Sequence, residues 1–295
     1  MPQDTPSSHR GSAGKIAHLG SPGSYSHEAC LKFAPHLEPV GFLTFKEVIQ
    51  AIEKDPEMRG MIPIENSFVG RVQDIYALLP TSKVSIETEF FLPIVHNLLA
   101  KPGSNVSALR TARGHPMALA QCRSAIERLN LTKIIDSDTG SACQYVAENS
   151  DGTMAAIGSL AAAQHYGLDV IEEAIQDSDG NKTRFLQIRE GKFIQPPTDD
   201  VFITTMVFEV RSIPSALYKC LGGFATNGIN LTKLESYYVG DNFRVAKFYC
   251  DFEGHPEHTN VKNAIEEIGF YSKNLIILGT YPANPLRNEF KTDNG

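Results

Sequence analysis

The chain has 295 residues, of which 42% are hydrophobic and 21% charged, a globular composition with room for two domains. Its formal net charge of -7 argues against nucleic acid or an anionic membrane surface as the main partner. No apolar run is long enough to span a bilayer, and the five cysteines are scattered without Cys-x-x-Cys spacing. Such cysteines are typical of reduced cytosolic thiols, so we expect a cytoplasmic protein without disulfides or a zinc site.

The chain begins with a polar stretch and a glycine-rich turn. Residues 1–13 lack the apolar core of a signal peptide and are expected to form a disordered leader. A strand over 15–19 leads through the turn 20–26 into a helix from about His27 to Phe33. A helix start after such a turn presents free N–H groups, and Ser24 and Ser26 add hydroxyls. The turn is therefore either an anion cradle or a plain strand–helix turn with serine as the N-cap.

A second polar turn ends the next buried strand. The apolar run 61–64 leads into Glu65, Asn66 and Ser67, and a helix is predicted over 72–79. Ligands in open α/β sheets bind at such strand ends, and Asn66 and Ser67 can donate hydrogen bonds to a carboxylate or a hydroxyl. The alternative is structural, with Asn66 or Ser67 as a helix N-cap and Glu65 as a first-turn acid.

The long apolar run over 84–100 is interrupted by Pro93, so the chain is expected to cross here into a second lobe. Strand–helix units are predicted over 109–129, 133–148 and 154–167, and residues 170–177 should return the chain to the first lobe. Alternating strands and helices with two crossings predict two α/β lobes that face each other. The turns of these units supply further candidate ligand groups, namely His115, Thr139 and Gly140. His115 is a candidate proton donor near neutral pH, although lone histidines are more often structural.

Residues 181–185, Asn-Lys-Thr-Arg-Phe, open the strand that ends at Ile188. A permanent cation beside a hydroxyl and an aromatic ring suits an anionic ligand that carries a ring. The guanidinium of Arg184 can bind a carboxylate with two hydrogen bonds, and Thr183 can donate a third. The alternative is an ordinary edge strand with a surface arginine.

The last third of the chain has a different organisation. Residues 191–200 carry two prolines and acidic residues and are predicted to be an interdomain linker. Strands are predicted over 202–210, 229–238, 243–252 and 274–279, with helices over 214–227 and 256–268. This βαββαβ order is ferredoxin-like. The polar tail, residues 282–295, is expected to be loose.

Taken together, these motifs resemble the prephenate dehydratase family. The segments that carry the resemblance are Leu19–His27, Ile62–Ser67, His115–Cys122 and Thr183–Phe185, and it extends from about Lys15 to Tyr281. The resemblance implies a two-lobed catalytic unit like periplasmic binding proteins, followed by a small regulatory domain. The catalytic unit would span 14–190, with lobe one at about 14–90 and 178–190 and lobe two at about 92–177. The regulatory domain would span 201–281.

The resemblance implies that prephenate is converted to phenylpyruvate, with loss of water and carbon dioxide and without a cofactor or metal, in phenylalanine biosynthesis. Thr183, with Asn66 and Ser67 near it, would assist the departing hydroxyl by hydrogen bonding, because threonine itself is a poor acid. Arg184 would anchor a substrate carboxylate and Phe185 would pack against the ring. The remaining substrate-binding candidates are Glu65, Ser24, Ser26, His115, Thr139 and Gly140.

The C-terminal unit is similar to an ACT domain, which in this family binds phenylalanine between paired subunits as a feedback inhibitor. Its family motifs Gly-Ala-Leu and Glu-Ser-Arg-Pro stand here as Ser-Ala-Leu and Glu-Ser-Tyr-Tyr. The implied effector-binding residues are Ser215, Ala216, Leu217, Asn230, Leu231, Glu235 and Ser236. The loss of Arg-Pro leaves the details of effector binding open, and a purely structural pairing module is the alternative. A homodimer or homotetramer formed through these domains is expected.

Two other functions fit the same sequence. An arogenate dehydratase would carry out the same chemistry on an amino acid instead of a keto acid. A non-catalytic sensor is the alternative of a different class, because solute-binding proteins share the two-lobed architecture and a fold does not fix a function.

Overall fold

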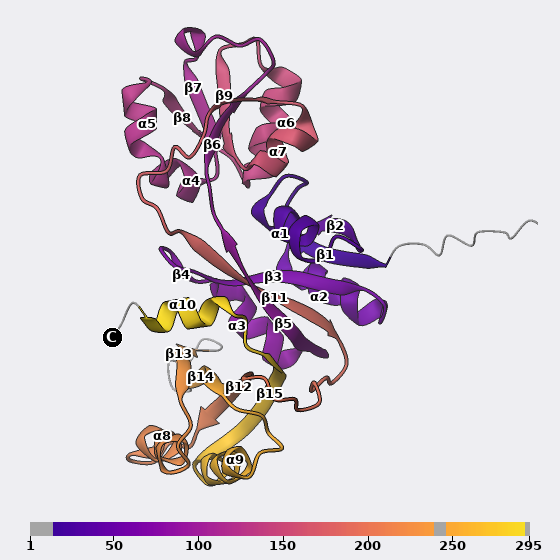
Figure 1. Ribbon diagram of the computed structural model, residues 1–295, viewed down its shortest axis with the longest axis vertical. Helices are drawn as coiled ribbons and strands as arrows, with labels where there is room; N and C mark the ends of the chain where they lie inside the picture. The colour runs from indigo at the N-terminus through magenta and orange to yellow at the C-terminus, as the bar shows by residue number, and fades with distance from the viewer. Residues whose placement is uncertain (1–13, 239–245, 293–295) are drawn as a thin grey trace, which may run out of the picture.

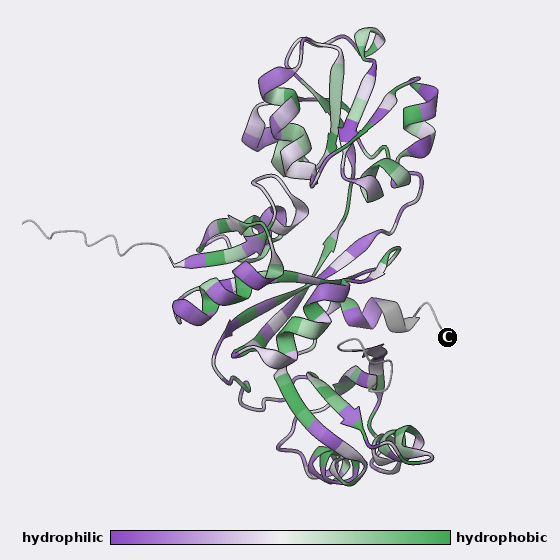
Figure 2. Cartoon of the chain, turned by 180° about the vertical axis from the view of Figure 1, so that it is seen from behind, coloured by the Kyte–Doolittle hydropathy of each residue, from purple (hydrophilic) through white to green (hydrophobic). Residues whose placement is uncertain are grey.

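A computed structural model describes residues 14–238 and 246–292, and it shows three units along one long axis (Figure 1). The predicted leader and the predicted turn at 240–242 lie outside these residues. The prediction of a two-lobed mixed α/β protein followed by a βαββαβ unit is confirmed by the element order. Within the described ranges, no helix is long and apolar enough to cross a membrane. Hydrophobic residues line the strands inside each unit, while hydrophilic residues mark the outer helix faces (Figure 2).

Lobe one is a mixed sheet with helices packed against it. Its strands are β1 (Lys15–Leu19), β2 (Glu38–Phe42), β3 (Arg59–Asn66), β4 (Gly70–Arg71), β5 (Val84–Pro93) and β11 (Lys182–Glu190). Its helices are α1 (Tyr25–Phe33), α2 (Phe45–Lys54) and α3 (Gln73–Leu78), with a 3-10 turn, η1 (Leu79–Thr81). Strand β11 runs antiparallel between β3 and β5, while β1 is parallel to β2 and β3. Strand β11, the last strand of lobe one in the sequence, therefore lies inside the sheet and not at its edge.

Helix α2 shows why these segments fold as they do. Its start is fixed by a capping box, in which Thr44 Oγ1 accepts from the Glu47 amide and the Glu47 carboxylate accepts from the Thr44 amide. Four apolar side chains follow the helical period and are buried against the sheet, namely Phe45, Val48, Ile49 and Ile52. The capping box and the apolar face thus favour the same helix, Phe45–Lys54.

Lobe two is a smaller, five-stranded sheet in the order β10-β6-β9-β7-β8. Its strands are β6 (Asn97–Ala100), β7 (Thr111–Gly114), β8 (Thr132–Ile135), β9 (Met154–Gly158) and β10 (Asp169–Glu172). Its helices are α4 (Pro116–Gln121), α5 (Arg123–Arg128), α6 (Thr139–Asn149) and α7 (Leu160–Tyr166), with the 3-10 turn η2 (Val106–Ala108). The chain crosses between the lobes after β5 and again after β10.

One predicted helix of lobe two is wrong, because residues 117–129 form two helices instead of one. The backbone of Cys122 leaves the helical region with φ -117° and ψ 29°. The carboxylate of Asp177, in the returning segment, accepts hydrogen bonds from the amides of Arg123 and Ser124 at 3.1 and 2.9 Å. Asp177, which is distant in sequence, thus caps the start of α5, and no local sequence pattern indicates this.

The C-terminal unit comprises β12 (Phe202–Val210), α8 (Ala216–Thr226), β13 (Leu231–Tyr238), β14 (Ala246–Glu253), α9 (Thr259–Tyr271) and β15 (Ser272–Pro282). Helices α8 and α9 pack together beside the strands (Figure 1). The sheet of this unit is continuous with that of lobe one, in the order β13-β14-β12-β15-β5-β11-β3-β1-β2. The two sheets meet where Gly279 of β15 pairs with Ile86 of β5. A Cβ atom at residue 279 would collide with the Ile86 carbonyl oxygen, so glycine permits this junction.

The expectation of a loose tail is wrong for residues 286–292, which form α10 (Leu286–Thr292). Arg287 of this helix is bound to the buried carboxylate of Glu89 in β5, with Nε–Oε1 and Nη2–Oε2 distances of 2.6 and 2.8 Å. The segment that links β11 to β12, predicted as 191–200, contains no helix or strand.

Candidate active site

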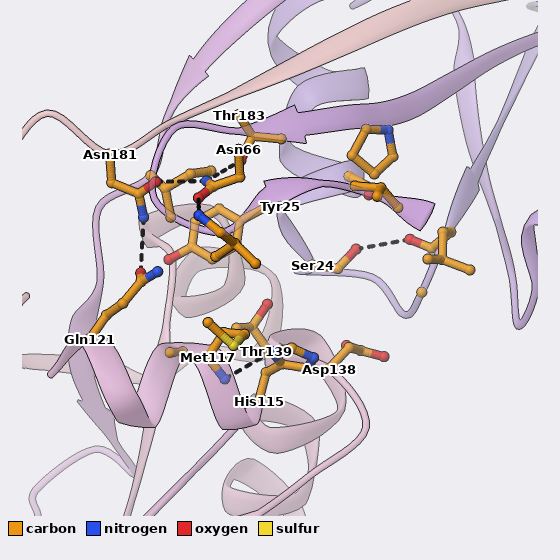
Figure 3. Close-up of a pocket in the computed structure, with 18 of the residues that line it drawn as sticks. Ser24, Tyr25, Asn66, His115, Met117, Gln121, Asp138, Thr139, Asn181 and Thr183 are labelled. Carbon is orange, nitrogen blue, oxygen red and sulfur yellow. Dashed lines mark hydrogen bonds between the residues drawn. The ribbon is translucent and has the colours of Figure 1, made fainter. Parts of the chain in front are cut away.

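A cavity of about 310 Å³ lies between the two lobes (Figure 3). Its walls come from the β1–α1 turn, the end of β3, the start of β11, and the starts of α4 and α6. Seven of the predicted site residues line it, namely Ser24, Ser26, Asn66, His115, Thr139, Thr183 and Phe185. The predicted strand-end turns of both lobes therefore converge on one cavity.

Thr183 and Asn66 are register partners in the β11–β3 ladder, and we call them the cavity rung. The amide of Asn66 donates from Nδ2 to Thr183 Oγ1 at 2.9 Å, while its Oδ1 accepts from the backbone amides of Phe68 and Val69 at 3.0 Å. These contacts fix which end of the Asn66 amide is which. Because Thr183 Oγ1 accepts from Asn66 and has no other partner in the described part of the chain, the hydroxyl proton remains available to a ligand in the cavity.

A series of hydrogen bonds between uncharged side chains extends from the cavity rung into lobe two (Figure 3). Asn66 Nδ2 also donates to Asn181 Oδ1 at 2.6 Å, and Asn181 Nδ2 donates to Gln121 Oε1 at 2.9 Å. His96 Nε2 lies 2.8 Å from the same Gln121 oxygen, and the Tyr25 hydroxyl lies 2.6 Å from His96 Nδ1. Burial lowers the pKa of His96, so the ring is neutral at pH 7. The Tyr25 hydroxyl also donates to the Val95 carbonyl oxygen at 2.8 Å. The Gln121 amino group keeps its donors for the cavity.

Four of these residues, Tyr25, His96, Gln121 and Asn181, were not predicted as site residues from the sequence. Tyr25 and Gln121 stand inside the motifs that carry the family resemblance, and Asn181 begins the segment 181–185, so their position was a usable signal. His96 lies in the crossing between the lobes, where no pattern marks it.

The two helix-start turns act mainly as caps and as contacts between the lobes. Ser24 Oγ accepts from the His27 amide at 3.3 Å and so caps α1. Asp138 caps α6 through the Ser141 amide at 2.9 Å, and its other oxygen accepts from the Ser21 hydroxyl of lobe one at 3.1 Å. Gly140 does not line the cavity, but a Cβ there would collide with the Pro22 carbonyl oxygen, so it allows the lobes to approach.

His115 lines the cavity as the cap of α4. Its Nδ1 accepts from the Met117 amide at 3.3 Å. Burial lowers the pKa of His115 against the opposing influence of Asp138, so the ring is neutral at pH 7. Only the Nε2 proton is then available for donation, which makes His115 a hydrogen-bond donor rather than a strong acid.

The predicted role of Arg184 as a carboxylate anchor in this cavity needs correction. Successive residues of a strand point to opposite faces, so Arg184 points away from the cavity that Thr183 and Phe185 line. Its side chain is 2% exposed and binds Asp251 Oδ2 at 2.5 Å, Glu89 Oε2 at 2.7 Å and the Tyr281 hydroxyl at 3.0 Å. These protein partners occupy all three nitrogens of the guanidinium.

Glu65 and Ser67 also lie outside the cavity. Glu65 is the register partner of Arg184, and we call this pair the domain rung. Its carboxylate binds Arg184 Nη1 at 3.0 Å and the ammonium of Lys233. Burial alone would raise the pKa of Glu65, but these two cations outweigh it and hold the pKa below its ordinary value. Ser67 Oγ accepts from the Lys182 amide at 2.9 Å, so this hydroxyl holds β11 instead of a ligand.

The predicted effector residues are spread over the C-terminal unit. Residues 215–217 lie at the start of α8, Asn230 and Leu231 at the start of β13, and Glu235 and Ser236 near its end. Ser236 contacts lobe one within the same chain, because its carbonyl oxygen accepts from Arg71 Nη1 at 2.6 Å, and Glu235 lies 3.6 Å from the same nitrogen. One chain therefore does not gather these residues into a single site.

Two α/β lobes with polar donors aimed into the cavity between them are typical of a protein that binds a small polar molecule. The sequence profile of the prephenate dehydratase family matches residues 16–192. A bifunctional N-acyl-homoserine lactone acylase/prephenate dehydratase of Komagataeibacter europaeus is 39% identical over 93% of this chain and 98% of its own. Arogenate dehydratase 5 of Arabidopsis thaliana is 36% identical over 94% of this chain and 69% of its own.

Solved structures agree with these relatives. Prephenate dehydratase of Arthrobacter aurescens in complex with L-Phe superposes with a TM-score of 0.83 and 26% identity, covering 95% of this chain and 97% of its own. The chain belongs to the prephenate dehydratase family.

Proposed function

We propose that this protein is a prephenate dehydratase, a hydro-lyase that converts prephenate to phenylpyruvate with loss of water and carbon dioxide. The observation that carries the proposal is the cavity rung, where Asn66 holds the Thr183 oxygen and leaves the Thr183 proton for a ligand. A leaving hydroxyl placed there would receive that hydrogen bond as the carbon–oxygen bond breaks. Preorganised donors of this kind act strongly in a site screened from water.

The other cavity groups suit the rest of prephenate. The Gln121 amino group and the His115 Nε2 proton are neutral donors for its carboxylates, and Arg71 is the one arginine or lysine among the cavity-lining residues of the described chain. Phe185, 1% exposed, packs its ring at the cavity wall, where the substrate ring would lie. Loss of the ring carboxylate needs no further protein group, because aromatisation drives it.

Arogenate is the second candidate substrate, since relatives named for that activity share more than a third of their aligned residues. Its ammonium group would need an acceptor in the cavity. Asp138 is the one acid that lines it in the described residues, and its oxygens already accept from Ser21 and Ser141. Asp138 is therefore committed to joining the lobes, and this favours the keto acid.

The regulatory part of the proposal concerns the C-terminal unit. Its βαββαβ order and the L-Phe complex of the Arthrobacter aurescens relative support an ACT domain that binds phenylalanine as a feedback inhibitor. Such a domain would pair two or four cytoplasmic chains. Inhibition by phenylalanine implies, by reciprocity, that substrate weakens phenylalanine binding.

The direct experiment measures phenylpyruvate absorbance with prephenate, and separately phenylalanine formation with arogenate. We expect a higher kcat/KM for prephenate than for arogenate, and a rate that falls as phenylalanine is added. Turnover of neither substrate would disprove the catalytic proposal, and a rate that ignores phenylalanine would disprove the regulatory one.

A further inference from the structure

The two rungs of the β3–β11 ladder are adjacent but serve opposite faces of the sheet. Thr183 and Asn66 face the cavity, whereas Arg184 and Glu65, one residue along each strand, face the C-terminal unit. Because both rungs belong to the same two strands, a displacement of the domain rung displaces the cavity rung.

Most partners of the domain rung belong to the C-terminal unit. Arg184 binds Asp251 of β14 and the Tyr281 hydroxyl of β15, and Asp251 and Glu89 have fully buried side chains. A second C-terminal hydroxyl, Thr205 Oγ1, donates to Asp251 at 2.6 Å. Buried opposite charges with such complete partners tolerate little displacement, because separating them leaves a charge unpaired in the interior.

Strand β13 holds the same hairpin at two further points. Lys233 binds the Glu65 carboxylate, and Arg71 of β4 donates to the Ser236 carbonyl oxygen at 2.6 Å. The tip between β3 and β4 is otherwise open, since Phe68 and Val69 are each 49% exposed. Strand β13 therefore supports the β3–β4 hairpin, which carries Asn66, on the side that faces the C-terminal unit.

We propose that Lys233 and the domain rung are positioning residues, which set the geometry of Thr183 and Asn66 according to how the C-terminal unit is seated. The link to turnover rests on the proposed function. Withdrawal of β13 would release Glu65 and Arg71 and let the Asn66 amide shift relative to Thr183. Misplacement of such a pair by about 1 Å lowers a rate severely, whereas ground-state binding through other groups is kept.

The test compares Lys233→Met with Lys273→Met in the full chain. Lys273 forms a 3.5 Å ion pair with Glu209 inside the C-terminal unit and is 52% exposed, so it is a control lysine whose ion pair does not involve the domain rung. We expect Lys233→Met to lower kcat about tenfold with little change in KM. Lys273→Met should match the wild type, and Lys233→Arg, which keeps a donor for Glu65, should restore most of the rate.

Hydrogen exchange provides a readout that does not depend on activity. Amides of residues 61–72 and 181–190 should exchange faster in Lys233→Met than in Lys273→Met, and Arg71→Gln should accelerate the same segments. The proposal is overturned if amide exchange in Lys233→Met and Arg71→Gln is the same as in the wild type. It is also overturned if exchange is faster in Lys233→Met while its kcat is unchanged. If the wild type turns over no substrate, the proposed function fails, and faster exchange confined to these segments still upholds the positioning contacts.

Discussion

The two faces of the β3–β11 strand pair use different chemistry. On the cavity face, neutral amides and hydroxyls bond to one another at 2.6 to 2.9 Å, and the chain leaves donors unused at Thr183 and Gln121. On the opposite face, full charges are paired at 2.5 to 3.0 Å and buried among themselves. A group that is to serve a ligand must keep a free donor, whereas a buried charge survives only when its partners are complete. The face with the weaker bonds is therefore the one suited to chemistry.

The largest expected effect tests the charged face through Arg184→Met. Removing the guanidinium leaves Glu89 and Asp251 buried without compensation, so the free energy of unfolding should fall by about 3 to 5 kcal/mol. Urea denaturation measures it. Arg128→Met is the control, because Arg128 pairs with Glu172 at the surface, and its loss should leave the free energy of unfolding nearly unchanged. If Arg184→Met instead raised KM and left the free energy of unfolding unchanged, Arg184 would be a substrate-binding residue.

The next effect tests the cavity face through Thr183→Ala. Removing one preorganised donor should lower kcat by about 10²- to 10³-fold, while the melting temperature stays nearly unchanged. Thr183→Ser keeps the hydroxyl and should retain much of the rate. Wild-type turnover by Thr183→Ala would show that the free proton of the cavity rung has no part in the reaction.

The smallest expected effect is a dependence of stability on pH that comes from a buried histidine of α1, in lobe one. Burial, together with nearby His18 and His165, lowers the pKa of His27 from 6.5 to about 4, and its Nδ1 accepts from the Gly23 amide. The unfolded chain therefore binds a proton first, and stability should fall as the pH drops from 6.5 towards 4. His27→Gln should reduce this slope in denaturation curves at pH 8, 6.5 and 5, and His36→Gln, at an exposed position, is the control substitution.

The charged face responds in a more acidic window. The pKa of Glu65 and that of Glu89 are lowered from 4.5, in each case against burial and by the nearby cations. The stability that they contribute is present above that value and is lost only as the pH falls below it. A slope between pH 6.5 and 5 that is as steep in His27→Gln as in the wild type would contradict the assignment of this contribution to His27.

Much of the fold followed from local patterns, because caps, apolar periods and turn residues act over a few neighbours. The capping box at Thr44 and the βαββαβ order are of this kind. The polar strand ends at Asn66 and Ser24 were found for the same reason. Arg184 was misplaced although strand alternation supplies the correction, since a residue next to Thr183 cannot share its face.

Other features could not be predicted because their partners are remote in sequence. Asp251 meets Arg184 from 67 residues away, and Asp177 caps α5 from a different segment. The junction of Gly279 with Ile86 joins two sheets through a single pair, which no periodicity encodes. Tertiary packing alone decides such contacts.

That junction has a consequence for any shortened form of the protein. Strand β5 is flanked by β11 on one side and by β15 on the other. A chain cut near residue 190 would bare the backbone of β5 along that border and strip Glu89 of Arg287. Unpaired borders of this kind recruit other chains, so the excised catalytic half should aggregate more readily than the intact protein.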